Sequence, residues 1–231
     1  MSTPARQPGA RVHVHATAEA AADAAAQEIA RRARAAVTDH GSFTLAVSGG
    51  RSPGRMLAAL AAQDMPWEQS TLFQVDERIG PADDPLRNLT GLRQALPAGC
   101  PVRVVPMPVE DDDLEAACGQ YAVALPRALD LIHLGLGADG HTASLIPGDP
   151  VLGVADADVA LTGVYQDRRR MTLTYPTIGR ASAILWLVTG ADKRRALALL
   201  SDRDPSIPAG LVDNADQVLF CDAAAAGVDD V

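Results

Sequence analysis

The chain has 231 residues, of which 48% are hydrophobic and 21% charged, a composition that is ordinary for a globular protein with a sizeable core. Its formal net charge of −9 argues against nucleic acid as a partner, because phosphate backbones are bound by dense Lys and Arg. A small anionic substrate is compatible with this charge if a few basic side chains cluster in one cleft.

Three widely spaced cysteines without a Cys-x-x-Cys pair argue against a disulfide framework or a structural zinc site. The N-terminus has no apolar run typical of a signal peptide, and no apolar stretch approaches the ~20 residues that span a bilayer. We therefore expect a cytoplasmic protein that does not bind membranes. Residues 1–10 are expected to be a disordered leader, residues 11–222 a single domain, and the Ala-rich residues 223–231 a flexible tail.

A long Ala-rich helix is expected first, capped by Thr17 and reaching about Val37. Short apolar runs then predict strands over 43–47, 71–75, 102–105, 130–135, 183–188 and 217–220. Helical patterns lie between several of these runs, over 53–62, 112–125 and 191–200. This alternation predicts a single-domain α/β fold with a mostly parallel sheet and helices on both faces. The stretch 159–174 contains two candidate strands and is expected to form a small antiparallel edge.

Ligands of an open α/β sheet bind beyond the carboxyl ends of its strands, so the segments that follow strands are the candidates for a site. The strand 43–47 is followed by Ser48, Gly49, Gly50 and Arg51. Paired glycines let the backbone approach a ligand closely, and the start of the next helix favours an anion such as phosphate. The loop lacks the Gly-Lys-Ser/Thr ending of a Walker A motif, and a tight turn without a ligand is the alternative interpretation.

The second candidate follows the strand 71–75 and reads Asp76-Glu77-Arg78. In the functional interpretation, Asp76 faces a sugar and Arg78 lies over an anionic group or a developing oxyanion. Such triplets are commonly surface salt bridges, which is the alternative interpretation here.

The third candidate follows the strand 130–135 and reads GLGADGHTAS. Its first six residues match the Gly-x-Gly-x-x-Gly dinucleotide fingerprint, but two prolines soon afterwards leave no room for the helix that this fingerprint requires. His141 is instead the residue of interest, since Asp139 can fix the tautomer of its imidazole and stabilise the imidazolium. A single histidine is more often structural, but the glycines, the hydroxyl residues and Asp139 around it favour a catalytic base.

The fourth candidate follows the strand 183–188, where Lys193 stands in the first turn of the predicted helix. A cation at this position opposes the helix dipole, which indicates an anion-binding role; an ordinary exposed lysine is the alternative. The basic run Arg168, Arg169 and Arg170 either supplies another phosphate contact or forms a solvated loop.

The chain resembles the 6-phosphogluconolactonase family, within the group that also includes glucosamine-6-phosphate deaminases, in five successive segments: LAVSGGRSP, VDER, LGLGADGHTASLIPG, RMTLTYPTI and VTGADKRRAL. The resemblance implies a Rossmann-like α/β fold. It implies hydrolysis of 6-phospho-D-glucono-1,5-lactone to 6-phosphogluconate in the pentose phosphate pathway, with a small phosphorylated sugar lactone as the partner. It also implies no nucleotide or other cofactor and no catalytic metal.

By motif match, the resemblance makes His141 the general base, with Asp139 as its neighbour and with Asp76 and Arg78 in the pocket. Hydroxyl, amide, glycine and basic residues of the matching segments become substrate-binding residues: Ser48, Gly49, Gly50, Arg51, Asn88, Gly137, Thr142, Arg170 and Lys193. The loop 48–51 and Lys193 are expected at the phosphate.

The chain departs from the family pattern at three places. Arg87 precedes Asn88 where the lactonases usually have Ser, and Arg51 stands before Ser52 in the glycine loop. The Lys-Pro-Pro run that usually comes before Arg170 is missing, so we take Arg170 as the second phosphate contact.

Two alternatives stay open. A glucosamine-6-phosphate deaminase and isomerase needs a carboxylate that moves a proton between C1 and C2, a task that Asp76 could perform. Deaminases commonly have Tyr or Trp after the Asp-Glu pair and a Glu shortly after the His, whereas this chain has Arg78 and no Glu in 142–150. The other alternative is a non-catalytic sugar-phosphate sensor, since this fold also occurs in transcriptional regulators. The sequence is compatible with a monomer or a small homo-oligomer.

Overall fold

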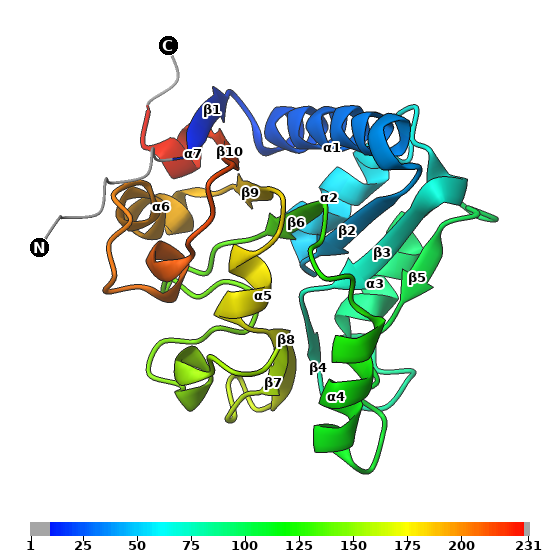
Figure 1. Ribbon diagram of the computed structural model, residues 1–231. Helices are drawn as coiled ribbons and strands as arrows, with labels where there is room; N and C mark the ends of the chain where they lie inside the picture. Colours follow the sequence, from blue (N-terminus) through cyan, green and yellow to red (C-terminus); the bar gives the residue numbers. More distant parts are fainter. Residues whose placement is uncertain (1–9, 229–231) are drawn as a thin grey trace, which may run out of the picture.

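The computed structural model describes residues 10–228, which form a parallel sheet, a small antiparallel sheet and the helices around them (Figure 1). The seven strands of the parallel sheet have the order β1-β10-β9-β6-β2-β3-β5. Their bounds are Arg11–His15 (β1), Phe43–Val47 (β2), Ser70–Gln74 (β3), Arg103–Val105 (β5), Leu131–Leu134 (β6), Ile184–Val188 (β9) and Gln217–Asp222 (β10). In the small sheet, β8 (Arg170–Leu173) lies between β4 (Asp76–Arg78) and β7 (Val159–Leu161).

The helices of the described residues lie in the connections between these strands, except for α7, which follows β10. The α-helices are Ala18–His40 (α1), Arg51–Leu60 (α2), Asn88–Ala95 (α3), Leu114–Ala124 (α4), Tyr175–Gly179 (α5), Arg194–Ser201 (α6) and Ala223–Ala226 (α7). Short 3₁₀ helices span Trp67–Gln69 (η1), Pro150–Gly153 (η2), Ala191–Lys193 (η3) and Pro208–Leu211 (η4).

Both faces of the parallel sheet are covered, because successive residues of a strand point to opposite faces. In β2, Leu45 and Val47 belong to the core beneath α1, α2 and α3. Ala46, which stands between them, belongs to the core on the other face, with α4, α6 and the small sheet. Figure 1 shows α1 along one side of the sheet and α4 on the opposite side. The result is the predicted α/β layering.

Helix α1 presents a buried stripe that is almost entirely alanine, which lets the helix lie close to its neighbours: Ala21, Ala22, Ala25, Ala26, Ile29, Ala30 and Ala33. Thr17 caps the helix, since its side chain accepts a hydrogen bond from the Ala20 amide at 3.1 Å. Gly41 ends it in the left-handed conformation, with φ of 84°. The predicted helix is confirmed, and it runs about one turn beyond Val37.

The predicted α/β fold is confirmed, and each predicted strand coincides with an observed strand to within two residues. Several short elements were not predicted, among them β1, β4 and α3. Strand β1 lies at the edge of the sheet, where Val12 and Val14 stay about half exposed, and its five residues RVHVH form no continuous apolar run. The helix predicted over 191–200 begins as the 3₁₀ helix η3 and becomes α6 at Arg194.

The structure describes the first part of the segment that was expected to be a flexible tail. Residues Ala223–Ala226 form α7, because the Asp222 side chain accepts a hydrogen bond from the Ala225 amide at 2.8 Å and caps the helix. Residues 229–231 of that tail lie outside the described residues. The expected leader also lies outside them, apart from Ala10.

The central strands β9, β6, β2 and β3 are neighbours and run parallel, so their carboxyl ends meet at one edge of the sheet. The four candidate segments of the sequence follow these strands, at 48–51, 76–78, 135–144 and 189–193. Segments that are far apart in the sequence are therefore brought to one place.

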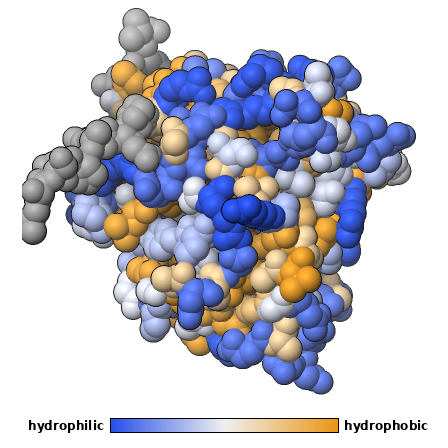
Figure 2. Space-filling view, in the orientation of Figure 1, coloured by the Kyte–Doolittle hydropathy of each residue, from blue (hydrophilic) through white to orange (hydrophobic). Residues whose placement is uncertain are grey.

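On the face shown in Figure 2, hydrophilic residues cover most of the surface and hydrophobic residues form scattered patches. Within residues 10–228, no helix combines the length and the apolar character that a membrane span requires.

Candidate active site

A cavity of about 280 Å³ opens where the carboxyl ends of the central strands meet. Nearly all of the site residues expected from the sequence line it: Ser48, Gly49, Gly50, Arg51, Asp76, Arg78, Asn88, Gly137, His141, Arg170 and Lys193. The expected cluster of basic side chains is therefore present, since Arg51, Arg78, Arg170 and Lys193 share this wall in a chain of net charge −9. Such a cluster focuses positive potential on the cavity.

His141 is held by Asp139 at the cavity wall. The Asp139 Oδ1 atom lies 2.6 Å from His141 Nδ1 and also accepts a hydrogen bond from the His141 amide at 3.2 Å. A carboxylate at Nδ1 favours the tautomer with its proton there, which leaves Nε2 free to accept a proton. Burial opposes ionisation of Asp139, but the charge and hydrogen bonds of His141 outweigh it and lower the pKa of Asp139. The pair is arranged as a base and its orienting carboxylate.

Glycine is required beside this pair. The Gly137 amide donates to the His141 carbonyl at 2.8 Å, and the Gly140 amide donates to the Gly137 carbonyl at 3.0 Å. These bonds fold the loop tightly, and Gly140 adopts a φ of 85°, which favours glycine. The glycines lead into turns rather than into a helix, so the match to the dinucleotide fingerprint has no structural counterpart.

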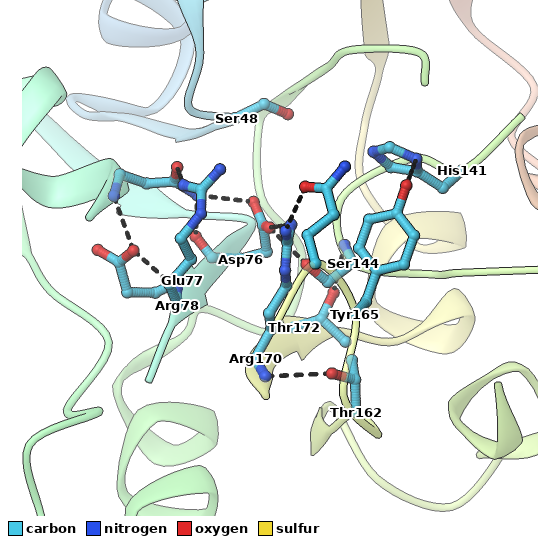
Figure 3. A network of polar contacts seen from close by, with 12 residues as sticks. Ser48, Asp76, Glu77, Arg78, His141, Ser144, Thr162, Tyr165, Arg170 and Thr172 are labelled. Atoms are coloured by element: carbon cyan, nitrogen blue, oxygen red, sulfur yellow. Dashed lines mark hydrogen bonds and ion pairs between the residues drawn. The ribbon is translucent and has the colours of Figure 1, made fainter. Parts of the chain in front are cut away.

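Tyr165 completes the surroundings of His141 and was not predicted. Its hydroxyl donates to Asp139 Oδ2 at 3.0 Å and lies 3.4 Å from His141 Nδ1, with the two rings edge to face (Figure 3). Burial and the hydrogen bond to Asp139 raise the pKa of Tyr165. The residue stands 24 positions after His141 in a segment without a motif, so the sequence alone carries no signal for it.

Asp76 is buried on the wall of the cavity and is not the surface residue of the alternative interpretation. Its carboxylate accepts from Ser144 Oγ at 2.6 Å and from Asn88 Nδ2 at 3.1 Å, and it lies 3.9 Å from Arg170 Nη1. Burial raises the pKa of Asp76, and the Ser144 hydrogen bond and the Arg170 charge oppose this rise. Figure 3 shows Asp76 between Arg78 and Arg170.

The side chains of Asp76-Glu77-Arg78 point to two sides of the strand, because alternate residues of a strand point the same way. Arg78 lines the cavity and donates to Asn88 Oδ1 at 2.6 Å. Glu77 is fully buried and accepts from the amides of Asn88 and Leu89 at 2.7 and 2.8 Å, so it binds the first amides of α3. Glu77 is therefore structural, whereas Asp76 and Arg78 face the site.

Arg170 is buried with unused hydrogen-bonding capacity. Its Nη2 donates to Gln166 Oε1 at 3.1 Å, while its Nε has no hydrogen-bond partner among the described residues. Burial lowers the pKa of Arg170, opposed by the nearby Asp76 carboxylate. Of its two neighbours in the basic run, Arg168 pairs with Asp84 and Arg169 donates to the Thr162 carbonyl. Of the three arginines, Arg170 is therefore the one that lines the cavity, and it is the one taken from the sequence.

The glycine loop approaches the cavity with its backbone. A Cβ atom at Gly49 would overlap the side chain of Asn88, and Gly50 has a φ of 114°, so both positions require glycine. Ser48 Oγ donates to the His133 carbonyl at 3.1 Å, which ties the end of β2 to β6. Burial lowers the pKa of His133 to about 3, so its ring is neutral and its Nδ1 accepts from the Ser48 amide at 3.4 Å.

Lys193 and Thr142, both expected to bind substrate, lie in different places relative to the cavity. Lys193 lines the cavity at the start of α6, with Nζ 3.2 Å from Asp192 Oδ2. Thr142 is buried in its loop, and its hydroxyl donates to the Gly135 carbonyl at 2.9 Å. Thr142 therefore braces the loop and is not among the residues that line the cavity. The sequence could not separate the two cases, because a Thr beside a catalytic motif can point inward or outward.

Known proteins have sequences similar to this chain. Residues 16–221 match the family model described as glucosamine-6-phosphate isomerases/6-phosphogluconolactonase. A 6-phosphogluconolactonase of Nostoc sp. is 33% identical over 213 residues, which cover 84% of this chain and 87% of the relative. A 6-phosphogluconolactonase of Streptomyces coelicolor is 35% identical over 212 residues, which cover 80% of each chain.

Solved structures show the same fold. A 6-phosphogluconolactonase from Shewanella baltica has a TM-score of 0.85 at 24% identity, over 93% of this chain and 98% of its own. A monomeric glucosamine-6-phosphate deaminase has a TM-score of 0.83 at 20% identity, over 95% of this chain and 100% of its own. Because the family model and the relatives above 30% identity each cover most of its length, the chain belongs to the family of glucosamine-6-phosphate isomerases and 6-phosphogluconolactonases.

Proposed function

We propose that this protein hydrolyses 6-phospho-D-glucono-1,5-lactone to 6-phosphogluconate, the lactonase step of the pentose phosphate pathway. The observation that carries the proposal is the Asp139-oriented His141 on the wall of a cavity that also presents four cationic side chains. The 33–37% identity to relatives named 6-phosphogluconolactonase supports the same activity.

The phosphate group supplies binding energy that orients the sugar ring. In our proposal it binds the amides of the glycine loop at the start of α2, with Arg51, Lys193 and Arg170 as cationic partners. The N-terminus of a helix offers free amides and a favourable dipole for an anion. The unpartnered Nε of Arg170 supports its part in this role.

His141 acts as the general base. Its Nε2 takes a proton from water as the water oxygen attacks C1 of the lactone, and the carbonyl becomes a tetrahedral oxyanion. Arg78 or loop amides stabilise that charge. The bond between C1 and the ring oxygen then breaks, and the imidazolium returns the proton to the ring oxygen. Asp139 stabilises the imidazolium between these two steps. The chemistry requires no cofactor.

Replacement of the base tests the assignment. General-base catalysis contributes typically ~10²–10⁴-fold, so His141→Ala is expected to lose about that factor in kcat while keeping the fold. A pH-stat assay on 6-phosphogluconolactone measures the loss after subtraction of spontaneous hydrolysis. His40→Ala is the matched control, because His40 lies at the exposed end of α1 and contacts Asp130. Near-normal turnover by His141→Ala would refute the role of His141.

Asp76 supports a second candidate activity, the deamination and isomerisation of glucosamine 6-phosphate. Its carboxylate is buried in the cavity, and burial raises its pKa, which suits a group that both accepts and returns a proton. Arg78 and the lack of a Glu in 142–150 favour the lactonase instead. Release of ammonia from glucosamine 6-phosphate would decide for the deaminase, and binding of sugar phosphates without turnover would decide for a sensor.

We also propose that residues 11–222 act as one domain in the cytoplasm, as a monomer or a small homo-oligomer that does not bind nucleic acid. The net charge of −9 supports the last point, because a polyanion would be repelled outside the local basic cluster.

A further inference from the structure

Tyr165 and His141 contact different oxygens of the Asp139 carboxylate. Oδ1 of Asp139 lies 2.6 Å from His141 Nδ1, and Oδ2 accepts the hydroxyl hydrogen of Tyr165 at 3.0 Å. Oδ1 also accepts from the His141 amide at 3.2 Å, so the contacts to Oδ1 come from His141 and the contact to Oδ2 comes from Tyr165. Contacts on both oxygens fix the plane of this carboxylate, whose side chain is 39% exposed, and that plane determines how the imidazole is turned.

Tyr165 is itself held by a braced hairpin. Its amide donates to the Arg168 carbonyl at 2.9 Å, and the Arg168 amide donates back at 3.3 Å. The two residues between them, Gln166 and Asp167, have φ of 49° and 63°, which is the geometry of a tight two-residue hairpin turn. The Arg168 side chain pairs with Asp84 in the loop that follows β4. The hairpin is thereby tied at its base.

The ring of Tyr165 is fixed from two further sides. The Arg170 guanidinium lies 5.1 Å from the centre of the ring, and the His141 ring meets it edge to face at 5.5 Å. Gln166 also accepts a hydrogen bond from Arg170 Nη2 at 3.1 Å. The ionisable groups that face the tyrosine hydroxyl and ring are therefore Asp139, His141 and Arg170. Figure 3 shows the hydroxyl directed at the His141 ring.

We propose that Tyr165 is a positioning residue for the hydrolysis, whose hydroxyl holds the Asp139 carboxylate against His141 so that the imidazole keeps its orientation and its proton on Nδ1. The proposal rests on the proposed role of His141 as the base. Tyr165 touches neither the water nor the lactone in this role; it acts through Asp139.

Tyr165→Phe tests the proposal, because it removes the hydroxyl and keeps the ring packed between Arg170 and His141. We expect kcat to fall about 2- to 12-fold, the rate equivalent of one hydrogen bond. We also expect the acid-side midpoint of the pH–rate profile to move to lower pH. Without the tyrosine hydroxyl, the Asp139 carboxylate is held less firmly against the imidazole and stabilises its protonated form less.

A double-mutant cycle with Asp139→Ala separates the proposed role from simple packing. If Tyr165 acts through Asp139, Tyr165→Phe costs almost nothing further once the carboxylate is gone. An equal loss in both backgrounds would overturn the proposal, as would a Tyr165→Phe profile that superimposes on the wild-type profile. Val164→Ala is the control on the same hairpin, since Val164 is 73% exposed, and it is expected to leave kcat and the profile unchanged.

His141→Ala distinguishes a wrong positioning role for Tyr165 from a wrong assignment of the base. If this variant loses turnover and Tyr165→Phe behaves like the wild type, the proposed function stands and the positioning role is wrong. If His141→Ala keeps near-normal turnover, the base is not His141, and the positioning role is overturned with it. Circular dichroism of each variant confirms that the fold is retained.

Discussion

Gly137→Ala perturbs the catalytic pair without touching either of its members. The backbone of Gly137 does not adopt a positive φ, so alanine causes no conformational strain there. Its Cβ atom, however, would overlap Nδ1 and Cε1 of His141 and would lie 2.6 Å from Asp139 Oδ1. The methyl group is therefore directed at the hydrogen bond that orients the base.

The size of the effect follows from these contacts. Ordinary contacts of a Cβ atom begin at 3.4 Å, so Asp139 has to move by about 0.8 Å and the His141 ring by more. A misplacement of about 1 Å can cost ~10²-fold in rate, and complete loss of the base costs ~10²–10⁴-fold. We therefore expect kcat to fall by at least ~10²-fold, while the KM for the lactone changes less, because the cationic residues at the phosphate stay in place.

Initial rates on 6-phosphogluconolactone, corrected for spontaneous hydrolysis, measure both constants. Gly119→Ala is the matched control, because Gly119 lies in α4 and a methyl group added there would meet no heavy atom within 4 Å outside its own stretch of helix. That variant is expected to retain kcat and to gain stability of up to about 1 kcal/mol, the helix preference of Ala over Gly.

A folded Gly137→Ala variant with kcat within about threefold of the wild type would refute this reasoning, since the pair would then tolerate a displacement of ~1 Å. A large rise in KM at unchanged kcat would also contradict it, because that result would place the Gly137 loop at the phosphate and not at the reacting carbon.

Two other substitutions test the binding site and the scaffold. Lys193→Ala is expected to raise KM about 10- to 100-fold with a smaller change in kcat, as for loss of a charged hydrogen bond to the phosphate; steady-state kinetics that show a fall in kcat alone would contradict this. Glu28 is partly buried, which opposes its ionisation, but Arg31 and Arg32 lower its pKa from 4.5 to about 2. Because the folded-state pKa is depressed, the pairing stabilises the protein above about pH 4.5, and the gain is lost as the pH falls toward 2. Glu28→Gln is therefore expected to lower the free energy of unfolding by ~1–2 kcal/mol at pH 7 and by progressively less below pH 4.5. Urea denaturation of both proteins measures this difference, and an equal difference at pH 7 and pH 3 would contradict the expectation.

The elements with strong local signals were predictable. The apolar runs of β2, β3, β6 and β9 and the alanine helix α1 were each recognised, because a buried strand or an amphipathic helix leaves a periodic pattern in the sequence. The short elements β1, β4 and α3 were missed. Their residues are ordered by neighbours distant in sequence, as when Glu77 binds the first amides of α3.

The site was predictable as a set of segments. Strand ends carry the ligand-binding residues of an α/β fold, so the segments beginning at Ser48, Asp76, Gly135 and Thr189 could be named before their positions were known. The glycines that allow close backbone approach, at Gly49 and Gly137, were also visible in the sequence.

The contacts that support the cavity residues from behind were decided only by the folded chain. Tyr165 reaches Asp139 and His141 through a hairpin that has no motif, Thr142 turns into its own loop, and Ser144 binds Asp76 across 68 positions of sequence.

The amino-acid sequence by itself therefore determined the layered fold, the strand-end segments and the pairing of His141 with Asp139, because each depends on periodicity or on residues two positions apart. Only the tertiary structure decided which side chains support that pair and which of the three arginines at 168–170 enters the cavity. The physical reason is that the orientation of these side chains is set by packing and hydrogen bonds between segments distant in sequence, and a local sequence pattern does not specify those contacts.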